Sequence, residues 1–554
     1  MRTITTLEPV LIGTGPLGID DVVAVARHGA SVALDPTALD AVAASRAIVE
    51  ALAEDPEPHY GISTGFGALA TTFIEADRRA QLQASLIRSH AAGSGAEVER
   101  EVVRALMLLR LSTLMTGRTG VRRETVEAYA AALNAGITPV VREYGSLGCS
   151  GDLAPLAHCA LALMGEGEVR VGGLETRPAS PGAPRPTGAA APGTPRPTGA
   201  AAPGAPGPAD GRIPAAEALA AAGIEPLRLV EKEGLALING TDGMLGMLAL
   251  ALDDLRMLLT TADIAAALSV EGLLGTDAVF AADLHALRPQ RGQADSAANL
   301  RRLLAGSPIV ASHRGSECTR VQDAYSLRCA PQVHGAARDT VAHAASVALA
   351  ELASAIDNPV ITPDGRVESN GNFHGAPIAY VLDFLAIAVA DVASMSERRT
   401  DRFLDKARSQ GLPPFLAHEA GVDSGLMIAQ YTAAGIVSEL KRLAAPASVD
   451  SIPSSAMQED HVSMGWAAAR KLRRAIDGLS RVLAIELLTA ARGIRLRAPL
   501  EPVAASAAVV ALMDRLGAGP GPDRYLSPEI EAAAAAVASG ELLRVVEAEI
   551  GELE

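Results

Sequence analysis

The stretch GMLGMLALALDDLRMLLTTADIAAALSVEGL at Gly243–Leu273 decides the fold class, because it stays apolar over about eight turns of an α-helix. Further amphipathic or apolar helical runs lie on either side of it. They are Glu97–Met115, Val341–Ile356, Ile378–Ala407, Ser424–Leu443 and Gly465–Arg492. Runs of about 16 to 30 residues are longer than the average helix and are typical of helical bundles. The sequence therefore predicts a mainly α-helical protein with a core of long bundled helices.

Strand signals are short and lie toward the N-terminal end. The segments Glu8–Ile12, Ser31–Leu34 and Glu168–Val171 predict a smaller, mixed α+β region there. Between the first two, Gly13–Gly18 matches the GxGxxG pattern of dinucleotide-binding folds, and Asp35 ends the second strand. No train of alternating βα units follows, and a lone match is weak evidence. We therefore do not expect a nucleotide site.

The composition excludes several classes of protein. Apolar residues make up 49% and charged residues 20% of the 554 residues, which excludes disorder over most of the length. The formal net charge of −16 is unfavourable for a nucleic-acid partner. Interior charges such as Asp253, Arg256 and Asp383 in the most apolar stretches argue against membrane spans. The 4 cysteines include no CxxC pair and no export signal is recognisable, so we expect a cytoplasmic protein.

A proline-rich segment interrupts the helical pattern. Residues 178–208 hold 10 of the 34 prolines and include a tandem repeat at 183–204. Proline lacks an amide donor and fixes φ, so we expect a solvated, disordered insert that serves as a linker. The expected organisation is an N-terminal region with the candidate active-site loop at 1–177, a Pro/Gly/Ala-rich insert at 178–211, and a long-helix bundle with a C-terminal helical region at 212–554.

A cluster of glycines and polar residues lies at Gly145–His158, GSLGCSGDLAPLAH. It does not fit the GxSxG nucleophile elbow, because position 152 is Asp. In Cys149-Ser150-Gly151 the glycine has no Cβ, so its nitrogen can approach the carbonyl carbon of residue 149 in a tight turn. Attack with loss of water, then elimination of the serine hydroxyl, would leave a five-membered ring with an exocyclic methylidene group. An isolated triad of this kind is most often a plain turn.

The neighbouring motifs make the triad recognisable. In chain order they are Tyr60–Gly67 (YGISTGFG), Ser89–Gly93 (SHAAG), Gly145–His158, Gly234–Thr241 (GLALINGT), Val321–Arg328 (VQDAYSLR), Asn370–Gly375 (NGNFHG) and Gln458–Val462 (QEDHV). Together they resemble the signature segments of the aromatic amino acid ammonia-lyases. The resemblance implies a long-helix bundle of the fumarase/ammonia-lyase type and a carbon–nitrogen lyase. It also implies that Cys149, Ser150 and Gly151 cyclise to 4-methylideneimidazol-5-one (MIO), with no external cofactor and no metal.

The same resemblance implies roles for residues outside the triad. Tyr60 is the candidate general base for the β-proton of the substrate, and Arg328 the candidate clamp for its carboxylate. The alternative for Tyr60 is an aromatic side chain that anchors its loop, and the alternative for Arg328 is a structural ion pair. The other candidates, which would hydrogen-bond MIO or the substrate or line the pocket, are Asn239, Gln322, Tyr325 and Phe373. Asp152, His374 and His461 are expected to be structural.

Two positions indicate L-histidine as the substrate within this family. His90 of SHAAG matches a position whose side chain helps to select the substrate ring. Glu459 of QEDHV matches a glutamate that is typical of the members that deaminate histidine. Among these members, the resemblance is to the actinobacterial kind. A carboxylate can hydrogen-bond an imidazole but would be poorly partnered beside a phenyl ring. The alternative for His90 is a histidine that serves only at a helix end, and the alternative for Glu459 is a helix N-cap partner. The resemblance further implies a homotetramer whose active sites are shared between chains.

Other functions remain open at this point. A tyrosine or phenylalanine ammonia-lyase or aminomutase could use the same scaffold, and an inactive relative could use the proline-rich insert to bind a partner. The chain also departs from the family pattern: Cys149 replaces the usual alanine of the triad, and Arg88 precedes SHAAG. Neither departure removes a group that ring closure requires, because the first residue of the triad contributes only its carbonyl.

Overall fold

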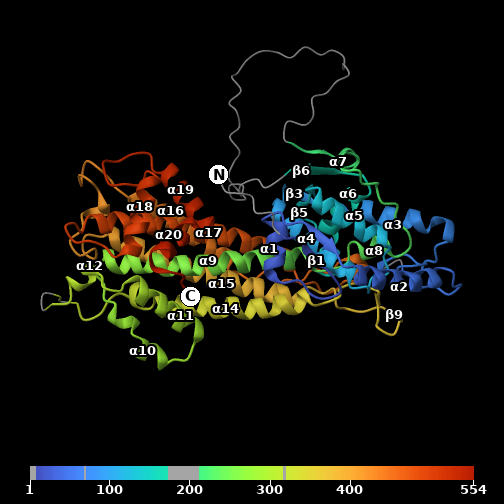
Figure 1. Ribbon diagram of the computed structural model, residues 1–554, viewed down its shortest axis with the longest axis horizontal. Helices are drawn as coiled ribbons and strands as arrows, with labels where there is room; N and C mark the ends of the chain where they lie inside the picture. The colour runs from blue at the N-terminus through green and yellow to red at the C-terminus, as the bar shows by residue number, and fades with distance from the viewer. Residues whose placement is uncertain (1–7, 68–69, 173–210, 316–317, 319) are drawn as a thin grey trace, which may run out of the picture. The chain divides into compact units, whose positions relative to one another are not determined.

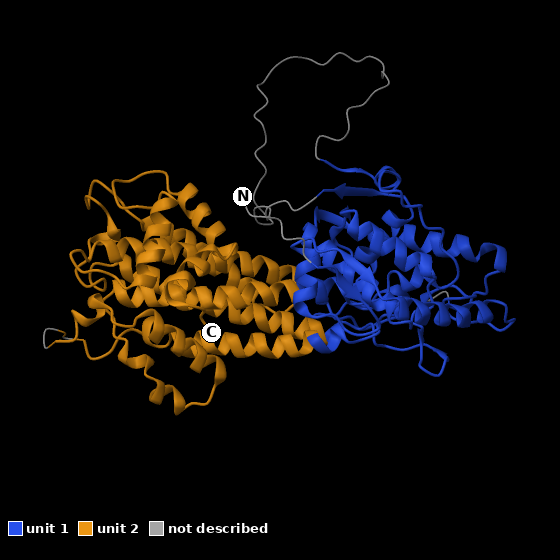
Figure 2. Ribbon diagram, viewed as in Figure 1, with its two compact units in different colours: residues 1–247, 349–376, 450–467 blue, residues 248–348, 377–449, 468–554 orange. Residues whose placement is uncertain are grey.

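The computed structural model describes residues 8–67, 70–172, 211–315, 318 and 320–554. The chain divides into two compact units (Figure 2). Unit 1 comprises Met1–Met247, Leu349–Ala376 and Asp450–Ala467, and unit 2 comprises Leu248–Ala348, Pro377–Val449 and Ala468–Glu554. Of the predicted proline-rich insert, all but Gly211 lies outside the described residues.

The described residues are mainly helical, as predicted (Figure 1). The helices of unit 1 are α1 (Ile19–Ala26), α2 (Pro36–Ala53), α3 (Ala76–His90), α4 (Arg100–Met115), α5 (Arg123–Asn134), α6 (Leu153–Leu163), α7 (Ala215–Ala221), α8 (Glu233–Ala236) and the 3-10 turn η4 (Ser455–Met457). Four long helices contain residues of both units: α9 (Asp242–Gly272), α14 (Ala330–Leu352), α15 (Ala376–Leu404) and α17 (Gly465–Arg495). The remaining elements of unit 2 are η2 (Ala278–Phe280), α10 (Ala282–Ala286), α11 (Arg291–Leu303), α12 (Pro308–Ala311), α13 (Tyr325–Arg328), η3 (Pro414–Leu416), α16 (Met427–Leu443), α18 (Ala504–Arg515), α19 (Ser527–Ala538) and α20 (Glu541–Ile550).

Small sheets lie in unit 1, which confirms the smaller mixed region. Strand β1 (Val10–Ile12) pairs in parallel with β2 (Val32–Leu34), and α1 connects them. The turn before α1 carries the GxGxxG match, but within the described ranges this sheet has two strands. The antiparallel pairs are β3 (Ser94–Glu97) with β5 (Arg142–Tyr144), β6 (Glu168–Val171) with both β4 (Ile137–Pro139) and β7 (Ile213–Pro214), and β8 (Val360–Ile361) with β9 (Val367–Glu368).

The predicted long helices are found, with one large difference in a boundary. Helix α14 begins at Ala330, well before the predicted start at Val341. The earlier residues include Gly335, a poor helix former. A Cβ at Gly335 would lie 2.3 Å from the backbone nitrogen of Gln293, so this glycine allows α14 to approach α11 closely. Tertiary packing therefore extends the helix where local propensity is unfavourable.

Buried charges join the long helices of unit 2. Glu486 of α17 accepts hydrogen bonds from Arg399 and Ser396 of α15, at 2.5–2.8 Å, and from Ser269 of α9, at 2.6 Å. Arg399 and Glu486 are fully buried. A buried carboxylate is tolerated only when its oxygens are paired in this way.

One helix of the described residues, α15, is long and apolar enough by length and composition to cross a membrane. In the structure, 61% of its apolar window is buried. Asp383, inside that window, pairs with Lys471 of α17 and accepts a hydrogen bond from the backbone of Ser448 at 2.8 Å. Packing within unit 2 thus accounts for the buried part of this apolar stretch.

Loss of Arg399 should destabilise the protein strongly. Arg399→Leu leaves the Glu486 carboxylate buried without its cation, and we expect a loss of about 3–5 kcal/mol in the free energy of unfolding. The double variant Arg399→Leu/Glu486→Leu should recover much of that loss, because no uncompensated charge remains. Denaturant unfolding measures both effects. The exposed pair Arg366–Asp364 provides the control: Arg366→Leu should leave the unfolding midpoint unchanged. Equal losses for Arg399→Leu and Arg366→Leu would contradict the argument.

Candidate active site

The triad loop connects β5 to α6 and folds back on the segment that precedes α9. Gly151 has φ +80° and pairs with Gly240 in an isolated β-bridge. The backbone nitrogen of Asp152 donates to the carbonyl of Gly240 at 2.7 Å. A Cβ at Gly151 would lie 2.0 Å from that carbonyl oxygen. Position 151 therefore excludes every residue other than glycine, for both conformational and steric reasons.

A second segment holds the start of the loop. Gly148 has φ +69°, and a Cβ there would lie 2.2 Å from the hydroxyl oxygen of Ser463. That hydroxyl donates to the carbonyl of Gly148 at 2.8 Å, and the backbone nitrogen of Met464 donates to Leu147 at 2.8 Å. The triad is thus fixed between two segments that are distant from it in the sequence.

Asp152 anchors the loop to the first turn of α9. Its Oδ2 accepts hydrogen bonds from the backbone nitrogens of Gly243 and Met244, each at 2.9 Å, and its Oδ1 accepts one from the Ser146 hydroxyl at 2.9 Å. Burial raises the pKa of Asp152 to about 7, although these hydrogen bonds oppose the rise. Both oxygens are engaged within the chain, which supports the structural role expected of this residue.

Arg110 of α4 holds the segment opposite the triad. Its fully buried guanidinium donates to the carbonyls of Ala236 and Asn239, at 3.0 and 2.8 Å, and pairs with Asp242 at 3.1 Å. A Cβ at Gly240 would lie 2.5 Å from this guanidinium. The guanidinium of Arg110 therefore supports the backbone around Gly240, which in turn contacts Gly151.

Glu459 lies directly beside the triad. Its Oε1 accepts a hydrogen bond from the Ser150 hydroxyl at 3.0 Å, and its Oε2 accepts from the Cys149 thiol at 3.0 Å and the Ser454 hydroxyl at 2.9 Å. Burial, and next the hydrogen bond to Glu459, raise the pKa of Cys149 to about 12. The carboxylate thus contacts the triad itself, and through Ser454 it also contacts the N-cap residue of η4.

His90 is the last residue of α3 and is half-buried. Its Nδ1 lies 2.9 Å from the carbonyl oxygen of Leu86. Because a carbonyl can only accept, this contact requires a proton on Nδ1 and leaves Nε2 as the acceptor of a neutral ring. Burial lowers the pKa of His90, opposed by the Leu86 carbonyl and the charge of Glu459. His90 therefore makes the contact expected of a helix-end histidine and also lies near enough to Glu459 to feel its charge.

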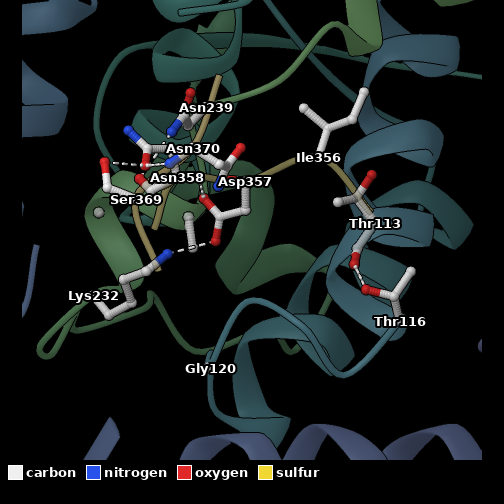
Figure 3. Close-up of polar contacts among 12 residues, drawn as sticks. Thr113, Thr116, Gly120, Lys232, Asn239, Ile356, Asp357, Asn358, Ser369 and Asn370 are labelled. Carbon is white, nitrogen blue, oxygen red and sulfur yellow. Dashed lines mark hydrogen bonds and ion pairs between the residues drawn. The ribbon is translucent and has the colours of Figure 1, made fainter. Parts of the chain in front are cut away.

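A polar network behind Asn239 fixes the orientation of its side chain (Figure 3). The Nδ2 of Asn239 donates to the backbone carbonyl of Asn358 at 3.0 Å. That carbonyl can only accept, so the amide oxygen of Asn239 must point elsewhere. This Oδ1 is buried and has no hydrogen-bond partner among the described residues. The Oδ1 of Asn358 accepts in turn from Ser369 at 3.1 Å and from the backbone of Asn370 at 3.0 Å.

An ion pair between two fully buried side chains supports this network. Lys232 Nζ lies 2.5 Å from Asp357 Oδ2, and the other oxygen of Asp357 accepts from the backbone of Asn358 at 2.8 Å (Figure 3). Burial lowers the pKa of Lys232 and raises that of Asp357, and each charge opposes the shift of the other. Neither residue is among those predicted from the sequence. Their only signal was position: Lys232 lies just before the GLALINGT motif.

The structure places the remaining candidates as two groups. In unit 1, Tyr60 is half-buried and its hydroxyl accepts from the backbone of Gly67 at 3.3 Å, while Phe373 is half-buried in the loop before α15. In unit 2, Gln322 and Tyr325 are exposed, and the Arg328 guanidinium carbon lies 4.7 Å from the centroid of the Tyr325 ring. The Nε of Arg328 is buried without a hydrogen-bond partner in the described part of the chain.

The two histidines expected to be structural contact each other. The rings of His374 and His461 stack at a centroid distance of 5.6 Å with an interplanar angle of 2°. Across the described ranges, no group of three or more His, Cys, Asp or Glu side chains could hold a metal ion.

The sequence profile of the aromatic amino acid lyase family matches residues 17–516. The chain therefore belongs to this family and is a carbon–nitrogen lyase. It is 61% identical over 550 residues to a histidine ammonia-lyase of Streptomyces griseus, covering 99% of this chain and 100% of that protein.

Solved structures agree with this assignment. The tyrosine aminomutase of Streptomyces globisporus matches with a TM-score of 0.87 and 36% identity, over 99% of this chain and 100% of that one. The histidine ammonia-lyase of Trypanosoma cruzi matches with a TM-score of 0.84 and 36% identity, over 98% of this chain and 96% of that one. The predicted long-helix fold of the ammonia-lyase type is thereby confirmed.

The thiol of Cys149 should resist alkylation in the folded protein. Its pKa of about 12 leaves very little thiolate at pH 8, and only the thiolate reacts. Iodoacetamide at pH 8, followed by peptide mass analysis, should find Cys149 unlabelled in the native protein and labelled after unfolding. Because its pKa is raised, the labelling rate should climb as the pH approaches 12. Equal labelling of native and unfolded protein at pH 8 would contradict the described environment.

Proposed function

We propose that this chain is a histidine ammonia-lyase, which removes ammonia from L-histidine without oxidation and releases trans-urocanate. The observation that carries the proposal is the contact of the Glu459 carboxylate with both Cys149 and Ser150. A carboxylate at the reacting centre suits a substrate whose ring carries an N–H donor. The identity of 61% to a histidine ammonia-lyase supports the same substrate.

The triad residues fit the formation of MIO. Gly151 holds the left-handed turn that brings the backbone round, and no side chain other than glycine fits there. The Gly151 nitrogen bonds to the carbonyl carbon of Cys149, and the carbonyl oxygen leaves as water with the amide protons of Gly151 and Ser150. Ser150 then loses its Cα proton and its hydroxyl as a second water. Once formed, MIO supplies an electrophilic carbon that makes the substrate amine a better leaving group.

Residues of unit 1 would bind the imidazole and the amine. Glu459 accepts the imidazole N–H, and His90 contacts the same ring beside it. Asn239 presents an amide oxygen with no partner in the described part of the chain, which suits an N–H of the substrate amine. Tyr60 takes the β-proton, and Phe373 lines the pocket.

Three further candidates would bind the carboxylate or line the pocket. Arg328 carries a buried Nε without a partner among the described residues and offers a planar pair of donors that matches a carboxylate. Tyr325, beside its guanidinium, supplies a hydroxyl, and Gln322 lines the pocket.

The proposed enzyme is a cytoplasmic homotetramer with active sites shared between chains, and with neither a nucleic-acid nor a membrane partner. Tyr380, Phe384 and Ile387 of α15 are 60%, 48% and 47% exposed and share one helix face. Exposed apolar side chains at this spacing favour coverage by another protein surface. Tyr325, 70% exposed, is an active-site candidate that a second copy would cover.

The purified protein should convert L-histidine to urocanate, which is followed by its ultraviolet absorbance. A parallel panel with L-tyrosine and L-phenylalanine tests the alternative suggested by the matching aminomutase structure. We expect urocanate formation to exceed cinnamate formation by at least a hundredfold, because Glu459 would face a phenyl ring without a donor. We expect it to exceed coumarate formation as well, because the only ring donor of tyrosine is its para hydroxyl and not a ring N–H. Faster formation of coumarate, cinnamate or a β-amino acid would favour the alternative.

Ser150→Ala should abolish turnover while the protein remains folded. Alanine cannot lose a hydroxyl, so the methylidene group cannot form. Intact-mass measurement should show the parent lighter than its sequence mass by two waters, and the variant without that loss. Thermal unfolding is the control for folding. A variant that still deaminates histidine at the parent rate would rule out the role of the triad, and a parent at its full sequence mass would favour an inactive scaffold.

A further inference from the structure

Cys149 makes a contact that ring closure does not require. The first residue of the triad contributes only its carbonyl to the ring, and the family pattern has alanine at this position. Here the side chain is 6% exposed and its thiol donates to Oε2 of Glu459 at 3.0 Å. The same oxygen accepts from Ser454 at 2.9 Å.

Ring closure changes the partners of the two carboxylate oxygens in different ways. The hydroxyl of Ser150, which donates to Oε1 of Glu459 at 3.0 Å, leaves as water. Oε1 thereby loses this donor. The side chains of Cys149 and Ser454 lose no atom in the reaction, so the donors to Oε2 remain. One oxygen of Glu459 is thus released while the other keeps two donors.

We propose that Cys149 is a positioning residue for Glu459: together with Ser454, its thiol holds Oε2 so that Oε1 faces the imidazole N–H of the substrate. The proposal rests on the proposed function, because it takes L-histidine as the ligand of Glu459. It assigns to the side chain of the first triad residue a part in substrate binding that alanine cannot supply.

The chemistry of the thiol agrees with a donor role. Burial, followed by the carboxylate beside it, raises the pKa of Cys149 to about 12, so the thiol keeps its proton at neutral pH. A thiol is a weak donor, but its acceptor is a charged carboxylate, which strengthens the hydrogen bond. Loss of one such bond corresponds to a change of about fivefold in affinity.

The first experiment compares Cys149→Ala and Cys149→Ser with the parent enzyme. For Cys149→Ala we expect kcat/KM for L-histidine to fall about fivefold, with the loss in KM rather than in kcat. Intact mass should still show the loss of two waters, because the carbonyl is unchanged. Cys149→Ser restores a donor and should recover most of the loss in KM. The matched control is Cys159→Ala, which removes another buried thiol, on α6, and should leave KM unchanged.

The second experiment measures binding without turnover. In Ser150→Ala the hydroxyl on Oε1 is absent and no ring forms, so calorimetry can measure the Kd of L-histidine directly. Adding Cys149→Ala should weaken binding about fivefold. Adding it to Ser150→Ala/Glu459→Gln should cause a much smaller change, because the charged acceptor is gone. A merely structural role of Cys149 would give the same change in both backgrounds.

The results separate the two proposals. If the parent forms urocanate but Cys149→Ala keeps both the parent KM and the parent Kd in the Ser150→Ala background, the positioning role is wrong and the proposed function stands. An equal effect with and without Glu459 overturns it as well. If Cys149→Ala fails to lose two waters, the calorimetric comparison alone decides. If the parent forms no urocanate and Ser150→Ala binds no histidine, the proposed function fails and the positioning role fails with it.

Discussion

The close approach of two backbone segments at Gly151 and Gly240 is the constraint on which the candidate site depends. The carbonyl of Gly240 lies where a Cβ of residue 151 would be, at 2.0 Å, and accepts the amide proton of residue 152. Arg110 supports Gly240 from the other side. The triad therefore occupies a turn that only glycine permits, packed against the segment before α9 that Arg110 of α4 supports.

Glu459 is the electrostatic centre of the same region. It receives three hydrogen bonds from Cys149, Ser150 and Ser454 and acts on the pKa of His90. These residues come from three separate segments of unit 1. A side chain with so many local donors has a defined orientation, and the proposed discrimination between an imidazole and a phenyl ring requires one.

Local pattern predicted the helices well and the polar contacts poorly. Helices α9 and α17 begin and end close to their predicted bounds, because α9 is apolar over nearly its whole length and α17 is strongly amphipathic. Helix α14 begins earlier because the close contact of Gly335 with α11 outweighs propensity. Lys232 and Asp357 are 125 positions apart, so no local signal could pair them. Family motifs brought Cys149, Ser150 and Glu459 to attention, but only the fold shows that they touch.

The contacts of the triad come from parts of the chain that are synthesised after it. Residues 240, 243 and 244 hold Gly151 and Asp152, and residues 463 and 464 hold the start of the loop. A nascent polypeptide that ends before these positions contains the triad but lacks the segments that hold it in its turn. The dehydration proposed for the triad would therefore serve as a chemical record, in the mass of the protein, that the later half of the chain has folded against the triad.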